Sequence, residues 1–180
     1  MVAMHWLLAA LLTIALMGAA LVLVNIPNTD PMKVQALGQH MAGGILLLAL
    51  MLTRLLVRVR TTHPARASTG SPGLDRVAWV SHRLLYALVL CQAASGLYLA
   101  LQAGLPEIVF GGHGALPADF WVFPMRSVHY AISRLLMAAI VLHVAAALYH
   151  AFILRDGLLR RMWFGRRLET TIARGGSRRD

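Results

Sequence analysis

Four long runs of apolar residues divide the chain, and short polar stretches that contain proline, glycine and charged residues separate them. The runs span approximately Val2–Val24, Leu37–Val57, Val77–Leu101 and Ser127–Leu154. A helix that crosses a bilayer needs about 20 consecutive, mostly apolar residues, so each run is long enough to cross once. The pattern therefore predicts an all-α protein, a transmembrane four-helix bundle.

The composition agrees with one membrane domain, since 58% of the residues are hydrophobic and the mean hydropathy is +0.66. We assign residues 1–155 to the bundle and residues 156–180 to a basic tail. The first run lacks a basic leader and a small-residue cleavage site, so we expect a retained helix rather than a cleaved signal peptide. In the tail we expect a short interfacial helix at Asp156–Trp163 and disorder beyond Gly165.

The formal net charge of +10 is concentrated on one side of the predicted bundle. Basic residues fill the connection between the second and third runs and the tail: Arg58, Arg60, Arg66, Arg76, Arg155, Arg160, Arg161, Arg166, Arg167, Arg174, Arg178 and Arg179. The other two connections hold only Lys33 and Arg126 as bases. The positive-inside rule then predicts that both termini are cytoplasmic. We expect such a tail to contact membrane lipid, not nucleic acid.

Histidines in the apolar runs are the main chemical signal of the chain. His129, His143 and His150 are spaced by multiples of seven in the fourth run, which places them on one stripe of an α-helix. The first run carries His5 and the second carries His40. Ionisable groups are costly in hydrocarbon unless they are paired or bound to a ligand, so these positions predict a binding site.

Depth in the membrane predicts which histidines meet. At a rise of about 1.5 Å per residue, His129 and His143 are about 21 Å apart along their helix. His40 and His129 both lie near the outer side. His5 and His143 lie deeper, and their levels differ by about 5 Å, which helix tilt can absorb. We therefore predict two haems, with His40 and His129 as axial ligands of one iron and His5 and His143 as ligands of the other.

The haem type and its role follow from the available side chains. Cys91 is the only cysteine, so the Cys-x-x-Cys motif for covalent attachment is missing and a b-type haem is expected. Two imidazoles fill both axial positions, which suits electron transfer better than oxygen chemistry. A haem-free membrane protein whose histidines serve transport is the alternative from another class.

Three further residues in the helices are candidate haem contacts. Gly44 lies one turn after His40 and would admit a flat macrocycle; equally, Gly43 and Gly44 would permit close helix packing. Arg54 would bind a haem propionate or anchor a helix end. Arg134 lies inside the fourth run and needs a partner such as a propionate.

Two histidines near the predicted cytoplasmic side are candidates for a quinone site. His82 and His150 would hydrogen-bond a quinone carbonyl and pass protons to it. The alternative is that both side chains extend to the membrane interface without binding a ligand.

Taken together, these residues resemble the bacterial cytochrome b561 family over nearly all of the chain from His5 to about Met162. The resemblance rests on His5-Trp6, His40 with Gly44, Thr53-Arg54-Leu55-Leu56-Val57-Arg58, His82-Arg83-Leu84-Leu85-Tyr86, Gly96, Ser127-Val128-His129 and Leu142-His143-Val144-Ala145-Ala146-Ala147-Leu148-Tyr149-His150.

This resemblance implies a multi-pass protein of the bacterial inner membrane with two b haems. It implies that His5 and His143 hold the cytoplasmic-side haem, that His40 and His129 hold the periplasmic-side haem, and that His82 and His150 lie near the quinone. Stand-alone members are similar to superoxide oxidase, which passes electrons from superoxide to ubiquinone. Such a protein would take its electrons from a donor on the periplasmic side. The alternative implied is an electron-relay subunit of a larger membrane dehydrogenase or hydrogenase.

Overall fold

The computed structural model describes residues 2–61 and 72–157, and within these ranges every regular element is helical. Four long helices and four short ones follow in this order: α1 (Val2–Leu21), η1 (Leu23–Asn25), α2 (Met32–Arg60), α3 (Pro72–Gln102), α4 (Leu105–Val109), η2 (Phe120–Val122), α5 (Pro124–Tyr149) and η3 (His150–Leu154). The elements η1 and η2 are 3₁₀ turns, and η3 is a π-helical continuation of α5.

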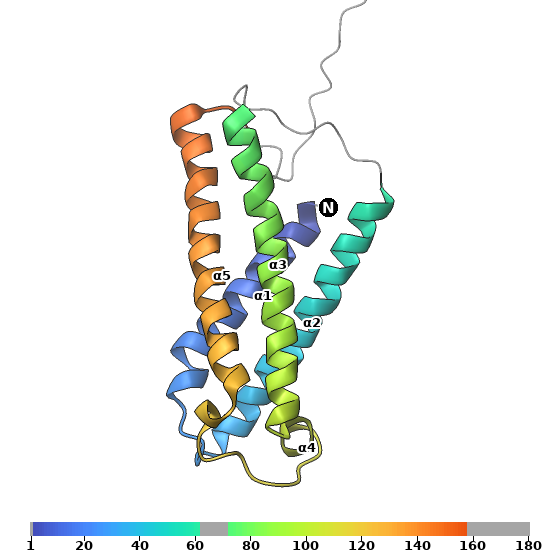
Figure 1. Ribbon diagram of the computed structural model, residues 1–180, viewed down its shortest axis with the longest axis vertical. Helices are drawn as coiled ribbons and strands as arrows, with labels where there is room; N and C mark the ends of the chain where they lie inside the picture. Colours follow the sequence, from blue (N-terminus) through green and yellow to red (C-terminus); the bar gives the residue numbers. More distant parts are fainter. Residues whose placement is uncertain (1, 62–71, 158–180) are drawn as a thin grey trace, which may run out of the picture.

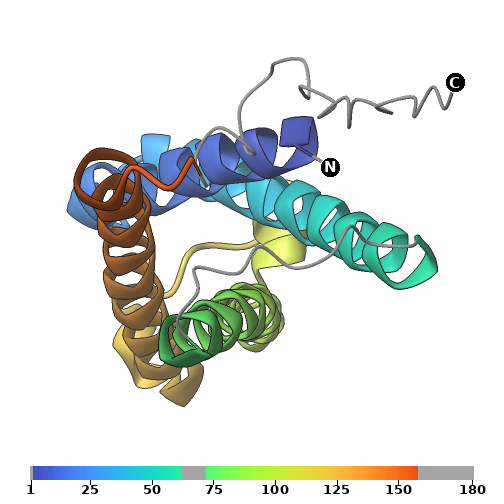
Figure 2. The same cartoon turned by 90° about the horizontal axis from the view of Figure 1, so that it is seen from above.

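The long helices form an elongated bundle in which α3 and α5 run side by side (Figure 1). Seen from above, α1 and α2 lie on one side, α3 lies on the opposite side, and α5 lies along the edge between them (Figure 2). The last turns of α2 lean away from α3 (Figure 1). We call the end of the bundle with η1, α4 and η2 the α4 end, and the opposite end, where α1 begins, the N end.

The four predicted spans are confirmed, since each long helix is long and apolar enough to cross a membrane. Large apolar side chains nevertheless face outward on every one of these helices; Ile14 is 67% exposed and Leu142 is 70% exposed. A water-soluble bundle would bury such side chains, whereas hydrocarbon solvates them. The outward faces of the helices are therefore suited to lipid.

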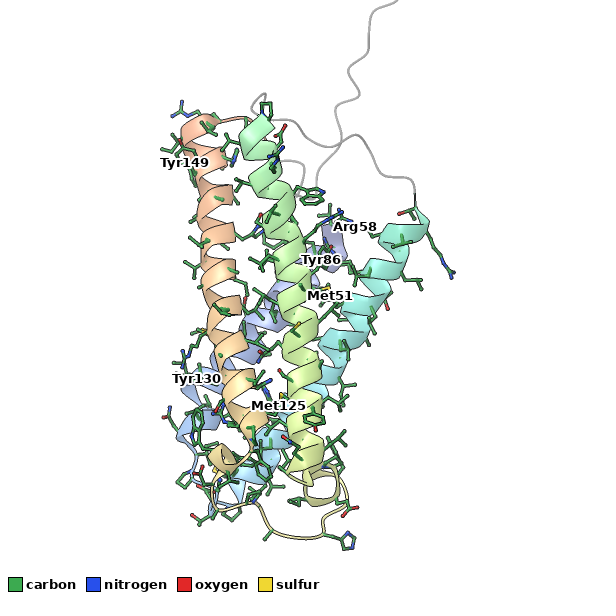
Figure 3. The ribbon with its side chains drawn as sticks, in the orientation of Figure 1. Met51, Arg58, Tyr86, Met125, Tyr130 and Tyr149 are labelled. Atoms are coloured by element: carbon green, nitrogen blue, oxygen red, sulfur yellow. The ribbon has the colours of Figure 1, made fainter. Side chains whose placement is uncertain are left out.

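Side-chain packing between the helices is concentrated in two clusters. At mid-height, Leu136 of α5 has no exposed surface and packs with Met51 of α2 and Val89 of α3. Figure 3 shows Met51 between α2 and α3. The other cluster lies at the α4 end, where Leu37 packs with Leu105 and two alanines at the end of α3. The first cluster joins α2, α3 and α5, and the second joins α2 and the end of α3 to α4.

Lys33 organises the connection between α1 and α2. Its side chain is only 6% exposed, and its ammonium group donates hydrogen bonds to the carbonyl oxygens of Leu23 (2.7 Å) and Ile26 (2.8 Å). The last carbonyls of a helix lack partners within the helix, and a cation is favoured there. Lys33 therefore caps η1, the turn that follows α1, from the first turn of α2.

Several boundaries differ from those expected from the sequence. The helix α3 already includes Pro72, inside the predicted connection, and proline suits the first turn of a helix. The short helix α4 interrupts the predicted loop after Gly104, whose φ of +63° suits glycine. The interfacial helix predicted from Asp156 is wrong at its first two residues, because Arg155 adopts a left-handed conformation that ends η3. The rest of that helix and the tail beyond Gly165 lie outside the described residues.

Candidate functional site

His40 of α2 and His129 of α5 meet near the α4 end of the bundle. Their ring centres are 6.3 Å apart, and the ring planes are nearly perpendicular, at 89°. Both side chains are partly buried. The two histidines that the depth argument paired are therefore neighbours. We call them the α4-end pair.

The ring centres of the α4-end pair are far enough apart to admit one metal ion between the two imidazoles. A metal–imidazole bond is about 2.0 Å long, and a ring nitrogen lies about 1.1 Å from the ring centre, so two axial imidazoles have centres about 6 Å apart. The observed 6.3 Å agrees with this value. Within residues 2–61 and 72–157, no three His, Cys, Asp or Glu side chains are grouped to enclose a bare ion. Two axial ligands suit an iron whose other ligands belong to a macrocycle.

Three residues of the helix α3 contact the ring of His129. The amide nitrogen of Gln92 lies 3.0 Å from Nε2 of the ring, and the hydroxyl of Ser95 lies 3.0 Å from Nδ1. Gly96 lies beneath the ring, since a Cβ atom added there would be 2.8 Å from Cε1 of His129. The position of His129 is thus set by three residues on one face of α3.

The glycines that follow His40 lie beside open space. A Cβ atom added at Gly43 or Gly44 would meet nothing within 4 Å. Glycines that permit close helix packing have a neighbouring helix against them, and neither residue has one here. The close-packing interpretation of Gly43 and Gly44 therefore finds no neighbouring helix in the structure, and the haem contact of Gly44 stays a prediction.

At the N end, histidines from three helices converge. The rings of His82 (α3) and His143 (α5) are 5.3 Å apart at 80°. His5 of α1 is close enough to interact electrostatically with both of them. We call these three residues the N-end group. Sequence reasoning placed His5 with His143 but missed that His82 joins them; the seven-residue spacing along one helix carries no information about a third helix.

The second predicted quinone residue, His150, has a different environment. Its Nδ1 atom forms an ion pair with the carboxylate of Asp156, just beyond the end of η3. His82, by contrast, shares a short contact of 2.6 Å between its Nδ1 atom and the carbonyl oxygen of Ala78. The carbonyl can only accept, so Nδ1 of His82 carries a proton and its Nε2 atom holds the lone pair when the ring is neutral.

Arg54 of α2 extends towards the N-end group and is close enough to interact with His5. Its Nε atom donates a 2.9 Å hydrogen bond to the hydroxyl of Tyr86 on α3, while its Nη1 atom is buried without a partner. Arg58 lies over the ring of the same tyrosine, 5.7 Å from its centre (Figure 3). A buried guanidinium nitrogen without a partner is costly, so this position suits an anionic group such as a propionate.

Two arginines of α5 bear on the predicted propionate contact. Arg134, expected to contact a propionate, is exposed and lies over the ring of Tyr130, 4.8 Å from its centre. Sequence reasoning missed Arg126, which is close enough to interact electrostatically with both His40 and His129. Its position three residues before His129, one helical turn away, was the available signal.

Comparisons with known proteins agree with this geometry. The family model described as prokaryotic cytochrome b561 matches residues 1–165. The chain belongs to this family. A protein of Yersinia pestis named probable superoxide oxidase CybB is 29% identical over 126 residues, which cover 68% of this chain and 72% of that protein. Cytochrome b561 homolog 2 of Escherichia coli is 29% identical over 168 residues, covering 89% of this chain and 87% of the relative.

Membership of the cytochrome b561 family identifies the chain as a membrane cytochrome b of bacterial type, an electron-transport protein that binds b-type haem. The histidines of the two groups are the candidate ligands. The buried Nη1 atom of Arg54, the open space at Gly44 and the spacing of the α4-end pair all fit such a cofactor.

Proposed function

We propose that this cytochrome b561 holds two b haems and passes electrons from a donor at its periplasmic side, with superoxide as the first candidate, to ubiquinone. The observation that carries the proposal is the 6.3 Å separation of His40 and His129, two residues from different helices. Each bound haem would supply a one-electron couple between ferric and ferrous iron. The protein would supply the axial imidazoles, the orientation of their rings and an apolar surrounding.

We assign the second haem to His5 and His143 in the N-end group. The proposed ligands on α5, His129 and His143, are 14 residues apart, which corresponds to about 21 Å along the helix axis. The two haems would therefore lie at different depths in the membrane. Arg54, with its unpartnered buried nitrogen, is the proposed contact for a propionate of this second haem. Arg126 is the corresponding candidate near the α4-end pair.

His82 and His150 are proposed to serve the quinone. Since Nδ1 of His82 donates to Ala78, the lone pair of its Nε2 atom remains to accept a hydrogen bond from a quinol hydroxyl. His150 with its partner Asp156 is placed nearer the end of the helix, where a proton can be exchanged with water. The overall reaction would convert two superoxide anions, one quinone and two protons into two molecules of dioxygen and one quinol.

The proposed orientation places the N end and both termini in the cytoplasm. It rests on the arginines that flank the N end and on the few bases at the α4 end. The α4-end pair would then lie near the periplasmic side, where an external donor arrives. The name of the Yersinia pestis relative, probable superoxide oxidase, supports superoxide as that donor.

The first test counts haems in the purified full-length protein. We expect two haems per chain in the wild type, and one in His129→Ala, because the loss of one axial ligand should release only the haem of the α4-end pair. His113→Ala, which alters an exposed histidine in a loop, is the matched control and should retain both. A His129→Ala protein with both haems intact would contradict the ligand assignment, and a colourless wild type would contradict the whole proposal.

The second test addresses the reaction. The purified wild type is supplied with a steady flux of superoxide and a soluble ubiquinone, and quinol formation is followed in the presence and absence of superoxide dismutase. The proposal predicts quinol formation that the dismutase abolishes. A protein that holds both haems but forms no quinol from superoxide would contradict the superoxide assignment and favour the alternative, a relay subunit.

A further inference from the structure

The polar contacts around His129 determine which of its ring nitrogens carries the proton. The amide nitrogen of Gln92, 3.0 Å from Nε2, has hydrogens and no lone pair to offer. With the amide oriented as it is in the structure, Nε2 accepts this hydrogen bond. In a neutral imidazole the proton is then on the other nitrogen, Nδ1.

The hydrogen bonds of Ser95 lead to the same tautomer of His129 by a separate argument. Its hydroxyl has a single hydrogen, which it donates to the carbonyl oxygen of Gln92 at 3.0 Å. The hydroxyl oxygen, 3.0 Å from Nδ1 of His129, can then only accept. Ser95 is 6% exposed, so water does not compete readily for this contact. Both bonds therefore require the same tautomer, with hydrogen on Nδ1 and the lone pair on Nε2.

We propose that Ser95 is a positioning residue for the haem ligand His129: it accepts the Nδ1 hydrogen, fixes the tautomer and directs the Nε2 lone pair towards the metal. This inference rests on the proposed ligand role of His129. A metal bond at Nε2 would replace the hydrogen bond from Gln92, whereas the bond to Ser95 would persist. A group that accepts a hydrogen bond from the nitrogen not bound to the metal makes the imidazole more basic. Removal of such a group typically lowers metal affinity by about 10–100-fold.

A more basic axial ligand stabilises ferric iron relative to ferrous iron, so it makes the midpoint potential of the haem more negative. Ser95 would therefore lower the potential of the α4-end haem and leave the other haem unchanged. A serine that served only to pack α3 against α5 would not select one haem in this way. The potential is thus a readout that separates positioning from general stability.

The experiment compares the full-length wild type with Ser95→Ala, Ser95→Cys and Ser95→Thr. Haem content and the two midpoint potentials are measured by spectroelectrochemical titration. We expect Ser95→Ala to shift one potential in the positive direction and to weaken haem binding at that site by about 10–100-fold. Cysteine, a weaker acceptor of nearly the same size, should shift the same potential by less, and threonine should restore the wild-type value.

Thr13→Val is the matched control, because the hydroxyl of Thr13, an exposed residue of α1, donates a comparable hydrogen bond to the carbonyl of Ala9 one turn earlier. It should match the wild type. Unchanged potentials in both Ser95→Ala and Ser95→Cys, or equal shifts of both haems, would overturn the inference while the two-haem proposal stands. Absence of haem from the wild type would instead overturn the proposed function itself.

Discussion

Gly96 lies at the closest approach between α3 and the proposed ligand His129, which makes it the sharpest place to perturb the structure. A Cβ atom at this position would be 2.8 Å from Cε1 and 3.3 Å from Nδ1 of the ring. Ordinary van der Waals contact begins at 3.4 Å, so the ring must move by at least 0.6 Å, the difference between 3.4 and 2.8 Å. Metal–ligand distances tolerate deviations of only about 0.2 Å.

The Gly96→Ala substitution should therefore disturb haem binding more than folding. Alanine is favoured over glycine inside a helix by about 1 kcal/mol. Overpacking of a well-packed contact costs about 1–3 kcal/mol. The two effects leave a net loss of at most about 2 kcal/mol in the free energy of unfolding. A folded protein with a displaced His129 ring is the expected result.

The assay is the ratio of haem to protein, together with the reduced-minus-oxidised spectrum of the purified variant. We expect Gly96→Ala to keep one haem and to lose the haem of the α4-end pair. Gly18→Ala is the control, since a Cβ atom added at Gly18 meets nothing within 4 Å. If Gly96→Ala retained two haems with unchanged midpoint potentials, the inference that Gly96 sets the position of the ligand would be refuted.

Two further predictions concern space and capping. Gly44→Leu, which fills open space beside His40, should leave the protein folded but reduce its haem content by one haem per chain. Gly18→Leu is the control, and an unaltered haem content in Gly44→Leu would show that the haem does not use this space. Lys33→Met removes two charge-assisted hydrogen bonds to the carbonyls of Leu23 and Ile26, each contributing about 1.5–3 kcal/mol. Thermal unfolding in one detergent should show a lower midpoint for Lys33→Met, and an unchanged midpoint would exclude the capping role.

The four spans and the pairing of His40 with His129 could be predicted from the amino-acid sequence. Both depend on quantities that act locally: the length of an apolar run against the thickness of the bilayer, and the rise per residue along a helix. The fourteen-residue interval between His129 and His143 is also a local property of one helix. It places two residues on one face at two depths, whatever the other helices do.

The contacts between helices required the tertiary structure. Whether His82 meets His143, whether Arg134 faces a cofactor or Tyr130, and whether Gly44 touches a neighbour all depend on how each helix is rotated about its own axis. In a membrane every face of a helix is apolar, so the hydrophobic pattern specifies that rotation poorly. The packing of Leu136 against Met51 and Val89 sets the rotation of the helices instead. The same rotation determines which face of α3 holds His129 in place.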